Sequence, residues 1–399
     1  MIEVTEKQNC CGCTACVAVC PKNCIEMKED MEGFLYPEVD QSSCIHCNAC
    51  DRVCPILNVK ERKPFEQSAY IVQNKDVEVL RESTAGGAFT AIAKYVIHNS
   101  GVVFGVELNK NLEAHHIYVE DVTELKRFRN SKYVQSSVGG TLRKVKFFLE
   151  QGKTVCFSGT PCQIEGLKCY LKKDYENLIT VDVVCRAVPS PLIFRKYVEL
   201  QKQELEDDIK TVRFRDKYYG YKYSTMNVVT DRNHGNYHQG VESDPWLRAF
   251  FSNICDRPSC HNCHFRNQYR VSDFTIWDCF HAGRFSKELD NDKGATRVLV
   301  HTDKGRRIFE AIKDDFSYVE VKPEEAVAGA KEMQESVKPH EQRQVFFEDA
   351  NKLSGSQLFY KYFPSTFRVK AEHFVRMACY KMGIYSLAKK VFVRLTKKY

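Results

Sequence analysis

The chemistry of this sequence is concentrated in its cysteines. Ten of the 19 cysteines lie within the first 54 residues, in two runs that share the pattern C-x2-C-x2-C-x3-C-P. Spacings of two allow three thiolates of one tight loop to bind three corners of an iron–sulfur cube, while the fourth cysteine reaches the other cluster. The runs therefore predict two 4Fe-4S clusters with crossed ligands. The expected ligands are Cys10, Cys13, Cys16 and Cys54 for the first cluster, and Cys20, Cys44, Cys47 and Cys50 for the second.

Structural zinc is the alternative interpretation, because zinc sites also use C-x2-C pairs. Two copies of the full spacing, each followed by proline, favour a bacterial-type ferredoxin module with two clusters. The runs begin 34 residues apart, so they indicate an internal repeat in which each run starts one half of a pseudo-symmetric fold. Cys11 and Cys24 lie outside the pattern and are expected to be small buried hydrophobic residues.

A third cysteine group lies much further along the chain. It has the spacing Cys255-x4-Cys260-x2-Cys263, and Cys185, which follows a predicted strand, is a candidate for the fourth ligand. Zinc, a plant-type two-iron cluster and a four-iron cluster are all compatible with this spacing. The sequence thus predicts a third metal site and leaves the metal open.

Two turns of small residues could position a cofactor. Residues Ser83–Gly87 precede a predicted helix, where free backbone N–H groups bind phosphate or an electron-rich ring edge, although a simple cap and tight turn explains them equally well. Residues Phe157–Gln163 turn from a strand into a helix and place Cys162 at the helix N-terminus, where a thiol has a lowered pKa. A nucleophilic-cysteine enzyme is a rival hypothesis, but no His or Asn partner stands at an informative spacing.

The elements that must position these residues alternate between strand and helix. Apolar residues recur at helical spacing over 88–97 and 163–171, and buried-strand patterns cover 102–106, 154–157 and 178–184. This alternation predicts an α/β (α+β) layered body. No G-x-G-x-x-G follows a strand and no G-x-x-x-x-G-K-[ST] occurs, which argues against a standard dinucleotide fold and a P-loop.

Four segments are expected from these patterns. Residues 1–60 form the two-cluster module, and the charged stretch Lys60–Pro64 is interpreted as a linker. Residues 67–150 and 151–330 form the two parts of the mixed α/β body, and 331–399 form a helical basic tail.

Composition and charge narrow the class of protein. With 43% hydrophobic and 28% charged residues, no long apolar run and no signal peptide at its start, the chain is expected to be a soluble cytoplasmic protein. In a reducing compartment, clustered cysteines indicate metal rather than disulfides. The net charge of +7 comes from the end of the chain, because residues 352–399 contain 11 Lys or Arg and one acid, Glu372. The remainder carries −3, so nucleic acid is not an expected partner.

The basic tail also has an amphipathic pattern, which Gly383 divides into two predicted helices. Such a helix can lie on an anionic membrane surface, which predicts peripheral contact with the inner face of the cytoplasmic membrane. The alternative is that its apolar face packs on the body while the lysines remain solvated. The apolar positions are Phe374, Met377, Ala378, Ile384, Leu387, Ala388, Val391, Phe392 and Leu395, and the basic ones are Lys381, Lys389, Lys390, Arg394, Lys397 and Lys398.

Six motifs, in order over about residues 70–330, resemble the coenzyme F420 hydrogenase/dehydrogenase beta-subunit family, in which a ferredoxin module is a common fusion. The motifs are Ser83…Gly86-Gly87-Ala88-Phe89, Ser131–Ser136, Ser158–Gln163, Cys185 with Pro189-Ser190-Pro191, Arg257-Pro258-Ser259-Cys260-x2-Cys263, and Ser272–Ile276.

The resemblance implies FAD and a four-iron cluster in the body. It places Lys132 as the catalytic residue, an electrostatic partner for a reduced, anionic flavin ring, whereas an exposed salt-bridging role is the usual one for lysine. The body cluster would use Cys260 and Cys263, with two ligands from Cys162, Cys185 and Cys255. The flavin-binding residues implied are Ser83, Thr84, Gly86, Gly87, Lys132, Gln135, Ser158, Gly159 and Thr160.

Two segments depart from the family pattern. Arg186-Ala187 stand where the family has His-Gly, and Trp277–His281 stand where it has Gly-Asp-Phe-Trp-Gly. These changes are expected to lie near the flavin or the substrate, so the family's deazaflavin substrate is not assumed.

The function expected is therefore that of a ferredoxin-linked, FAD-dependent oxidoreductase. Clusters carry single electrons and organic substrates usually need two, so a flavin that handles both would stand between them. The expected partners are a soluble electron carrier such as ferredoxin and an unidentified organic substrate. The alternatives are a non-enzymatic iron–sulfur subunit of a larger complex and a deazaflavin coenzyme F420 dehydrogenase or reductase.

Overall fold

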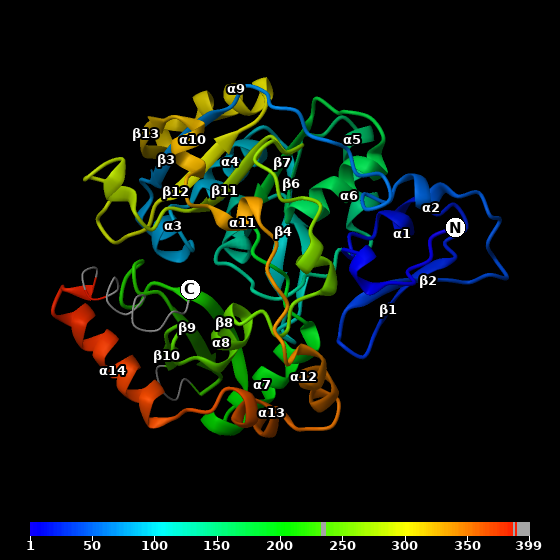
Figure 1. Cartoon of the computed structure of the whole chain (residues 1–399). Helices are drawn as coiled ribbons and strands as arrows, with labels where there is room; N and C mark the ends of the chain where they lie inside the picture. The colour runs from blue at the N-terminus through cyan, green and yellow to red at the C-terminus, as the bar shows by residue number, and fades with distance from the viewer. Residues whose placement is uncertain (233–236, 386–387, 389–399) are drawn as a thin grey trace.

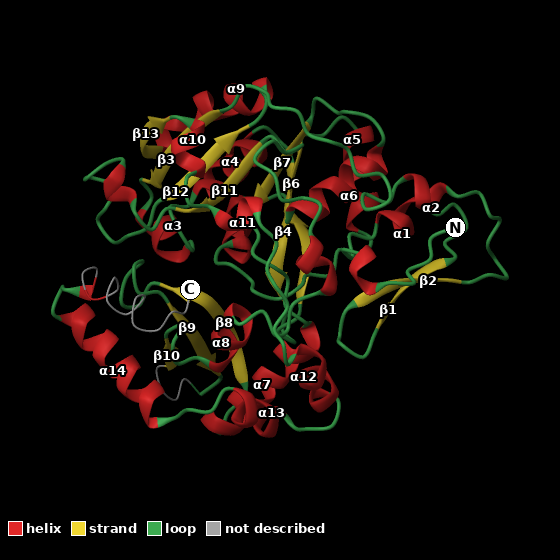
Figure 2. Ribbon diagram, viewed as in Figure 1, coloured by secondary structure: helices red, strands yellow, loops and turns green. Residues whose placement is uncertain are grey.

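The computed structural model describes residues 1–232, 237–385 and 388, and it places a small N-terminal module beside a larger body (Figure 1). The body contains a large mixed sheet with helices on both faces, and a smaller sheet below it in the view of Figure 2. This arrangement confirms the predicted mixed α/β class. Among the described residues, no helix is both long and apolar enough to cross a membrane.

Eight strands form the large sheet. Its centre, β11-β7-β6-β4, is parallel, and antiparallel strands flank it on both sides. The strand β3 of residues 67–150 lies between β13 and β12 of residues 151–330, and β4 and β5 form the opposite edge, so the two parts of the body share one layer. In spatial order the strands are β13 (Phe316–Val321), β3 (Ser68–Asn74), β12 (Thr296–Val300), β11 (Phe274–Asp278), β7 (Leu178–Val183), β6 (Val155–Gly159), β4 (Val102–Leu108) and β5 (Ala114–Val119).

Alternate residues of the central strands point to opposite faces of the sheet, and both faces are buried. Val103 and Cys156 pack with α4 (Ala88–His98) and α9 (Asp303–Ile312), whereas their neighbours Phe104 and Phe157 pack in a second core. That second core contains α5 (Thr141–Glu150), α6 (Pro161–Leu171) and residues of the first cysteine run. The predicted helices at 88–97 and 163–171 and the three predicted strands are thus confirmed, with ends shifted by a few residues.

The lower part of the body is a three-stranded antiparallel sheet with helices around it. The strands are β8 (Ile209–Asp216), β9 (Thr225–Thr230) and β10 (Tyr237–Gln239), and Trp246 and Tyr197 lie fully buried in the shared core. The packed helices are α7 (Pro191–Leu205), α8 (Pro245–Phe251), α12 (Arg343–Ala350) and α13 (Gly355–Tyr362). A further helix, α14 (Phe367–Lys381), ends just before Gly383, whose φ is +74°, as the sequence predicts.

The N-terminal module has the two-fold repeat expected from its cysteine runs. Each run leads into a short helix, α1 (Ala15–Val19) or α2 (Ala49–Arg52), and a hairpin of β1 (Ile25–Glu29) and β2 (Leu35–Val39) joins them. The segment 59–67 that follows has neither helix nor strand. The remaining short elements are α3 (Val77–Glu82), α10 (Pro323–Val327), α11 (Lys331–Gln334) and 3-10 turns at Lys7–Asn9, Val122–Phe128, Pro258–Asn262, Ala282–Arg284 and Lys313–Asp315.

Candidate iron–sulfur and cofactor sites

The first cysteine run lies at the junction of the module and the body. Burial, with the neighbouring thiols of Cys10 and Cys54, raises the pKa of Cys16 to about 12, and the Cys13 thiol faces both Cys10 and Cys16. The four thiols expected to share the first cluster are therefore neighbours. Gly166 of α6 permits this packing, because a Cβ added there would lie 2.6 Å from Cys13 Cβ and 2.7 Å from its Sγ.

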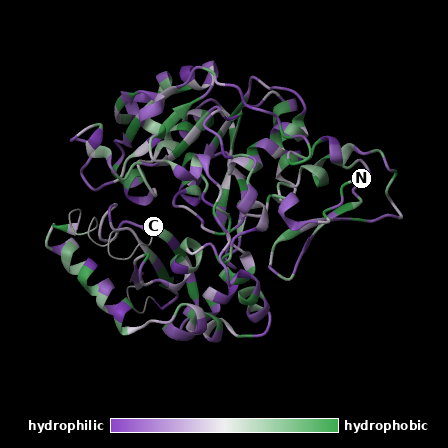
Figure 3. Ribbon diagram, in the orientation of Figure 1, coloured by the Kyte–Doolittle hydropathy of each residue, from purple (hydrophilic) through white to green (hydrophobic). Residues whose placement is uncertain are grey.

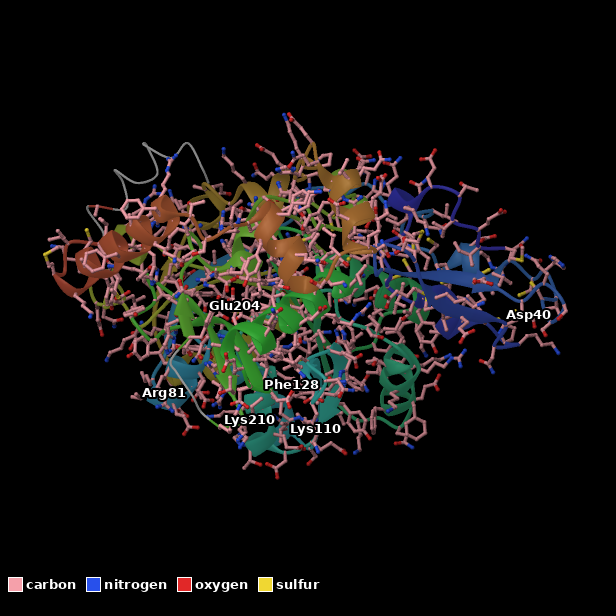
Figure 4. The ribbon with its side chains drawn as sticks, turned by 90° about the horizontal axis from the view of Figure 1, so that it is seen from below. Asp40, Arg81, Lys110, Phe128, Glu204 and Lys210 are labelled. Carbon is pink, nitrogen blue, oxygen red and sulfur yellow. The ribbon has the colours of Figure 1, made fainter. Side chains whose placement is uncertain are left out.

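The second expected ligand set surrounds one hollow of about 340 Å³ in the outer part of the module. Asp40 marks this outer end in Figure 4, with sulfur atoms nearby. Cys47 is exposed, and the backbone N–H of Ile2 donates to Cys50 Sγ at 3.2 Å. Cys24 is buried, as predicted, but its Sγ lies 3.4 Å from Cys20 Sγ and it also lines the hollow. The ligands that line it are Cys20, Cys44, Cys47 and Cys50.

A hollow of about 520 Å³, which we call the third hollow because it accompanies the third group of thiols, lies between the module and the body, since Cys11 and Ile56 line it together with body residues. Cys162 lies at the start of α6, Cys185 follows β7, and Cys260 and Cys263 come from the 3-10 turn Pro258–Asn262 and its end. Burial and the thiols of Cys162 and Cys263 raise the pKa of Cys185 to about 12. The structure thus brings together four of the five cysteines considered for the body cluster.

Cys255 is the cysteine that the structure separates from this group. Its side chain is fully buried in the core with Trp246 and Ile254, and its pKa is raised by burial and by the carboxyl of Asp256. The geometry therefore suggests Cys162 and Cys185, rather than Cys255, as the two cysteines that would join Cys260 and Cys263 as ligands. The run Cys255-x4-Cys260-x2-Cys263 is one ligand pair preceded by a core residue.

The three thiol groups differ from a preformed site for a single ion. Among the described residues, no three His, Cys, Asp or Glu side chains converge closely enough to hold one metal ion. Zinc needs its four thiolates about 2.3 Å from a common centre, whereas the thiolates of a cube bind separate iron atoms. The expected ligands of the second and third sets each line one hollow.

Cys162 does not have the lowered pKa expected for a thiol at a helix N-terminus. A hydrogen bond with the Cys11 thiol, followed by burial, raises its pKa well above the usual value. Thr160 Oγ1 lies 3.2 Å from its sulfur and provides no base. The site therefore gives no support to the nucleophilic-cysteine hypothesis, and metal binding is the role that would draw the proton from this thiol.

Cys11 and Arg257 connect the first cysteine run with the third hollow. The Cys11 thiol interacts with those of Cys13 and Cys162 and lines the third hollow. Arg257, fully buried, donates to the Cys10 carbonyl at 2.8 Å and to Gln135 Oε1 at 2.9 Å, and its Nη2 lies 3.6 Å from Cys10 Sγ. Gln135, implied as a flavin contact, also donates to the Cys11 carbonyl at 3.3 Å, so it belongs to this junction.

The other residues implied for the flavin fall into two groups. Ser158, Gly159 and Thr160 end β6 and cap α6: the Thr160 N–H donates to Gln163 Oε1 at 2.9 Å, and Ser158 Oγ donates to the Phe104 carbonyl at 3.1 Å. These polar groups are thus engaged within the fold.

The second group surrounds the turn Ser83–Gly87. Thr84 Oγ1 lies 3.0 Å from Ser131 Oγ, which brings this turn to the segment that contains Lys132. The Gly86 N–H donates to Thr296 Oγ1 at 2.7 Å, and a side chain at Gly86 would collide with β3 and β12. Gly87 precedes α4 with a φ of +78°, in the left-handed region. The glycines are therefore explained by the turn itself, as in the cap interpretation.

Lys132 is not an exposed salt-bridging lysine. Its Nζ donates to the carbonyls of Arg127 at 3.0 Å and Arg129 at 2.9 Å. Burial and the nearby Arg213 guanidinium lower its pKa to about 7. A lysine held among carbonyls and another cation is placed to receive an anionic group.

Of three basic residues at the end of β8, Lys217 contacts this turn, Arg213 contacts Glu82 just before it, and Arg215 lies near both cations. Arg213 Nη2 donates to the Glu82 carbonyl at 2.9 Å, and Lys217 Nζ donates to the Ala85 carbonyl at 2.6 Å. Arg215 pairs with Asp278 at 3.2 Å, while its Nη2 is buried with no hydrogen-bond partner among the described residues. We call Lys132, Arg213, Arg215 and Lys217 the basic cluster.

The departure from the family pattern at 277–281 lies beside the basic cluster. Phe280 stacks with Tyr221 at a centroid distance of 5.0 Å, and the Arg215 guanidinium lies 5.1 Å from the Phe280 ring. The other departure, Arg186, donates to Asn253 Oδ1 at 3.0 Å next to the third hollow. The two departures therefore lie in different places, one beside the basic cluster and one beside the body thiols.

Sequence reasoning did not find the basic cluster or Arg257. The signal was present in the alternation Arg213-x-Arg215-x-Lys217, which places three cations at a spacing of two at the end of a strand. Arg257 was part of a recognised motif, but its partners lie more than 120 residues away in the sequence, at Cys10 and Gln135.

Comparisons with known proteins agree with the cysteine patterns. Residues 152–327 match the model for the C terminus of the beta subunit in the coenzyme F420 hydrogenase/dehydrogenase family, and residues 9–57 match the 4Fe-4S dicluster domain. Both matches confirm the predicted resemblance and the iron–sulfur module. No curated protein matches the chain. Among solved structures, a chain of the F420-reducing NiFe hydrogenase complex from Methanosarcina barkeri is 17% identical, with a TM-score of 0.44, over 76% of this chain and 94% of that one.

Proposed function

We propose that this chain is an iron–sulfur flavoprotein oxidoreductase of the coenzyme F420 hydrogenase/dehydrogenase beta-subunit family, because residues 152–327 match the model for the C terminus of that subunit and residues 9–57 match the 4Fe-4S dicluster domain. In this proposal, electrons pass between a soluble carrier such as ferredoxin, the three cluster sites and FAD. FAD in turn reduces or oxidises an organic substrate by two electrons.

One observation carries the proposal: the thiols form a continuous series from the surface to the body. Cys47 is exposed in the second set, Cys16 of the first set faces both Cys50 and Cys10, and Cys11 connects Cys13 with Cys162 of the third hollow. A purely structural role for three metal sites does not need them to be adjacent. Electron transfer requires the three sites to be adjacent, because each cluster must pass its electron to the next.

The basic cluster supports FAD as the flavin. Arg213 pairs with Asp216 at 2.9 Å and Arg215 with Asp278 at 3.2 Å, but Arg215 Nη2 is buried without a hydrogen-bond partner among the described residues, and Lys132 Nζ donates to backbone carbonyls. A pyrophosphate would supply that partner, since arginine forks bind its oxygens in pairs. Lys132, Arg213, Arg215 and Lys217 would therefore hold the cofactor, and bound FAD would supply the exchange between one-electron and two-electron steps.

Residues around the basic cluster would limit the access of water to the cofactor and balance its charge. Phe280 and Tyr221 cover one side of the basic cluster, and Lys132, with a pKa of about 7, would offer a positive charge to an anionic part of the bound cofactor. The segment 277–281, which differs from the family pattern, places Phe280 beside Arg215 of the basic cluster. We therefore propose an organic substrate of undefined structure rather than the deazaflavin coenzyme.

The test is anaerobic purification with quantitation of iron, sulfide, zinc and flavin, followed by redox screening against candidate acceptors. We expect about twelve irons for three four-iron clusters, one FAD, and reoxidation that depends on an organic acceptor. Iron without flavin would instead favour an electron-carrying subunit of a larger complex. Zinc in place of iron in the body site would contradict the electron-transfer role of that site.

A further inference from the structure

The helix α14 leaves large apolar side chains exposed and buries a charged one. Its inward positions include Arg376 and Cys379, which are buried, while Phe367 is 87% exposed and Phe374 is 64% exposed. A helix of a soluble protein normally buries its apolar stripe and exposes its charges. The interpretation in which the apolar face packs on the body therefore fails for Phe374 and holds for Met377, which contacts Tyr219, and for Ala388, which packs with the cluster of Tyr223, Cys379 and Tyr385.

Polar contacts fix the inward face of α14. Arg376 donates to Glu372 at 3.0 and 2.7 Å, and His373 Nδ1 lies 2.9 Å from Glu242 Oε1 of the body. Tyr223 also donates to Glu242 at 2.7 Å, so the helix is attached to the lower sheet through a buried network. Because this network uses the inward positions, the helix cannot turn its apolar side inward without breaking it.

The outward face combines an apolar stripe with basic borders. The stripe follows helical spacing, with apolar residues every three or four positions. Its members are Phe367, Ala371, Phe374, Val375, Ala378 and Met382. At about 100° per residue, Arg368 falls on one border of this stripe, and Lys370 and Lys381 on the other. All three basic residues are exposed. Figure 1 shows α14 at the outer edge of the molecule, and Figure 3 shows hydrophobic and hydrophilic residues alternating along it.

We infer that this face of α14 binds the surface of a membrane that contains anionic lipid, with the stripe in the headgroup region and the basic borders on lipid phosphates. Glu372, the one acid of residues 352–399, is bound to Arg376 and so does not oppose this contact. The residues that follow add five more cations, Lys389, Lys390, Arg394, Lys397 and Lys398, although these, like Leu387, Val391, Phe392 and Leu395, lie outside the described residues.

A second copy of the chain fits this face less well than lipid does. Two such faces in contact would bring the basic borders of one copy, at Arg368, Lys370 and Lys381, against those of the other, and like charges oppose association. An anionic bilayer instead offers apolar depth and negative charge together, as interfacial helices require. The inference does not depend on the identity of the cofactors.

The experiment is co-sedimentation of the full-length protein with phosphatidylglycerol-containing and pure phosphatidylcholine vesicles at low and high salt. We expect binding to the anionic vesicles alone, weakened by salt. Lys370→Gln with Lys381→Gln should reduce partitioning about 30-fold, at about 1 kcal/mol per charge. Phe367→Ser with Phe374→Ser should reduce it by about tenfold or more.

The matched control is Phe147→Ser with Val345→Ser, which removes two side chains that are 55% and 52% exposed elsewhere on the body. This control should bind as the parent does, and circular dichroism and cluster absorbance should be the same for all variants. Three results would overturn the inference: no binding of the parent at low salt, equal binding to neutral vesicles, or unchanged binding of the Phe367/Phe374 variant. Self-association that this variant abolishes, without vesicle binding, would assign the face to a dimer instead.

Discussion

The two cysteine runs have the same spacing but lie in very different surroundings. Body arginines reach the first run: Arg257 contacts Cys10, and Arg143 donates to the carbonyls of Val17 and Ala18 at 2.8 and 2.9 Å. The second run is held within the module, where the N-terminal amine contacts Asn48 and Asp51 at 2.8 and 2.5 Å. Figure 4 shows the outer end of the module, at Asp40, far from Phe128 of the body.

This difference gives the two runs separate tasks in the proposed electron path. A cluster near exposed Cys47 can exchange electrons with a soluble carrier, while a cluster beside buried Arg257 can pass them to the body. Burial and nearby charge set the reduction potential of a cluster as strongly as its ligands do. Equal spacing therefore does not imply equal chemistry.

The largest effect is expected from Cys20→Ala and Cys54→Ala. Because the fourth cysteine of each run serves the other cluster, each variant should lose one cluster of four irons, and the two should lose different clusters. Iron analysis and the paramagnetic spectrum of the reduced proteins measure this. Spectra identical to the parent in both variants would refute the ligand sets.

Substitutions can distinguish the expected ligands of the body cluster from Cys255, the core cysteine near them in the sequence. Cys260→Ala with Cys263→Ala should remove the third cluster, whereas Cys255→Ala should retain all iron and lower the free energy of unfolding by about 1–2 kcal/mol. Iron content and thermal melting distinguish the two outcomes. Loss of iron from Cys255→Ala at an unchanged melting temperature would place Cys255 among the ligands.

One arginine lies next to each cysteine run, so substituting each in turn tests how far burial sets the reduction potential of the neighbouring cluster. Arg257→Met removes a buried cation near Cys10 and should lower the potential of the first cluster by roughly 60 mV, about tenfold in the one-electron equilibrium. Arg52→Met removes an exposed cation that donates to the Cys47 carbonyl at 2.9 Å, where water screens the charge, so a smaller shift of the second cluster is expected.

A redox titration followed by paramagnetic resonance measures both potentials. Arg257→Lys, which keeps the charge, should retain most of the parent's value. Equal shifts in the two Met variants, or a shift of the second cluster in Arg257→Met, would contradict the assigned difference in surroundings.

The smallest effect concerns the body end of the path. The pKa of Lys132 is lowered to about 7, so it loses its positive charge as pH rises through this value. An anionic cofactor stabilises the charged form, so FAD affinity should fall about fivefold between pH 7 and 8. Fluorescence titration of the apoprotein measures this. In Lys132→Met the dependence should be weaker, and a profile identical to the parent's would remove Lys132 from the cofactor site.

The sequence by itself determined the features that depend on local spacing. The four cysteines of each run lie within about eleven residues of one another, so their pattern alone indicates a cluster loop, and the helix Ala88–His98 follows from its apolar period. The end of α14 at Gly383 is local in the same way, because glycine readily adopts a positive φ.

Only the tertiary structure decided which distant residues meet. Cys162 and Cys185 reach the third hollow because β6 and β7 are adjacent parallel strands, while Cys255 points into a core that its sequence neighbours do not reveal. The basic cluster arises where β8 meets the turn Ser83–Gly87, and α14 exposes its apolar stripe because Glu242 binds His373. These last two contacts join residues 131 positions apart in the sequence, and their energies depend on packing and burial that no local pattern encodes.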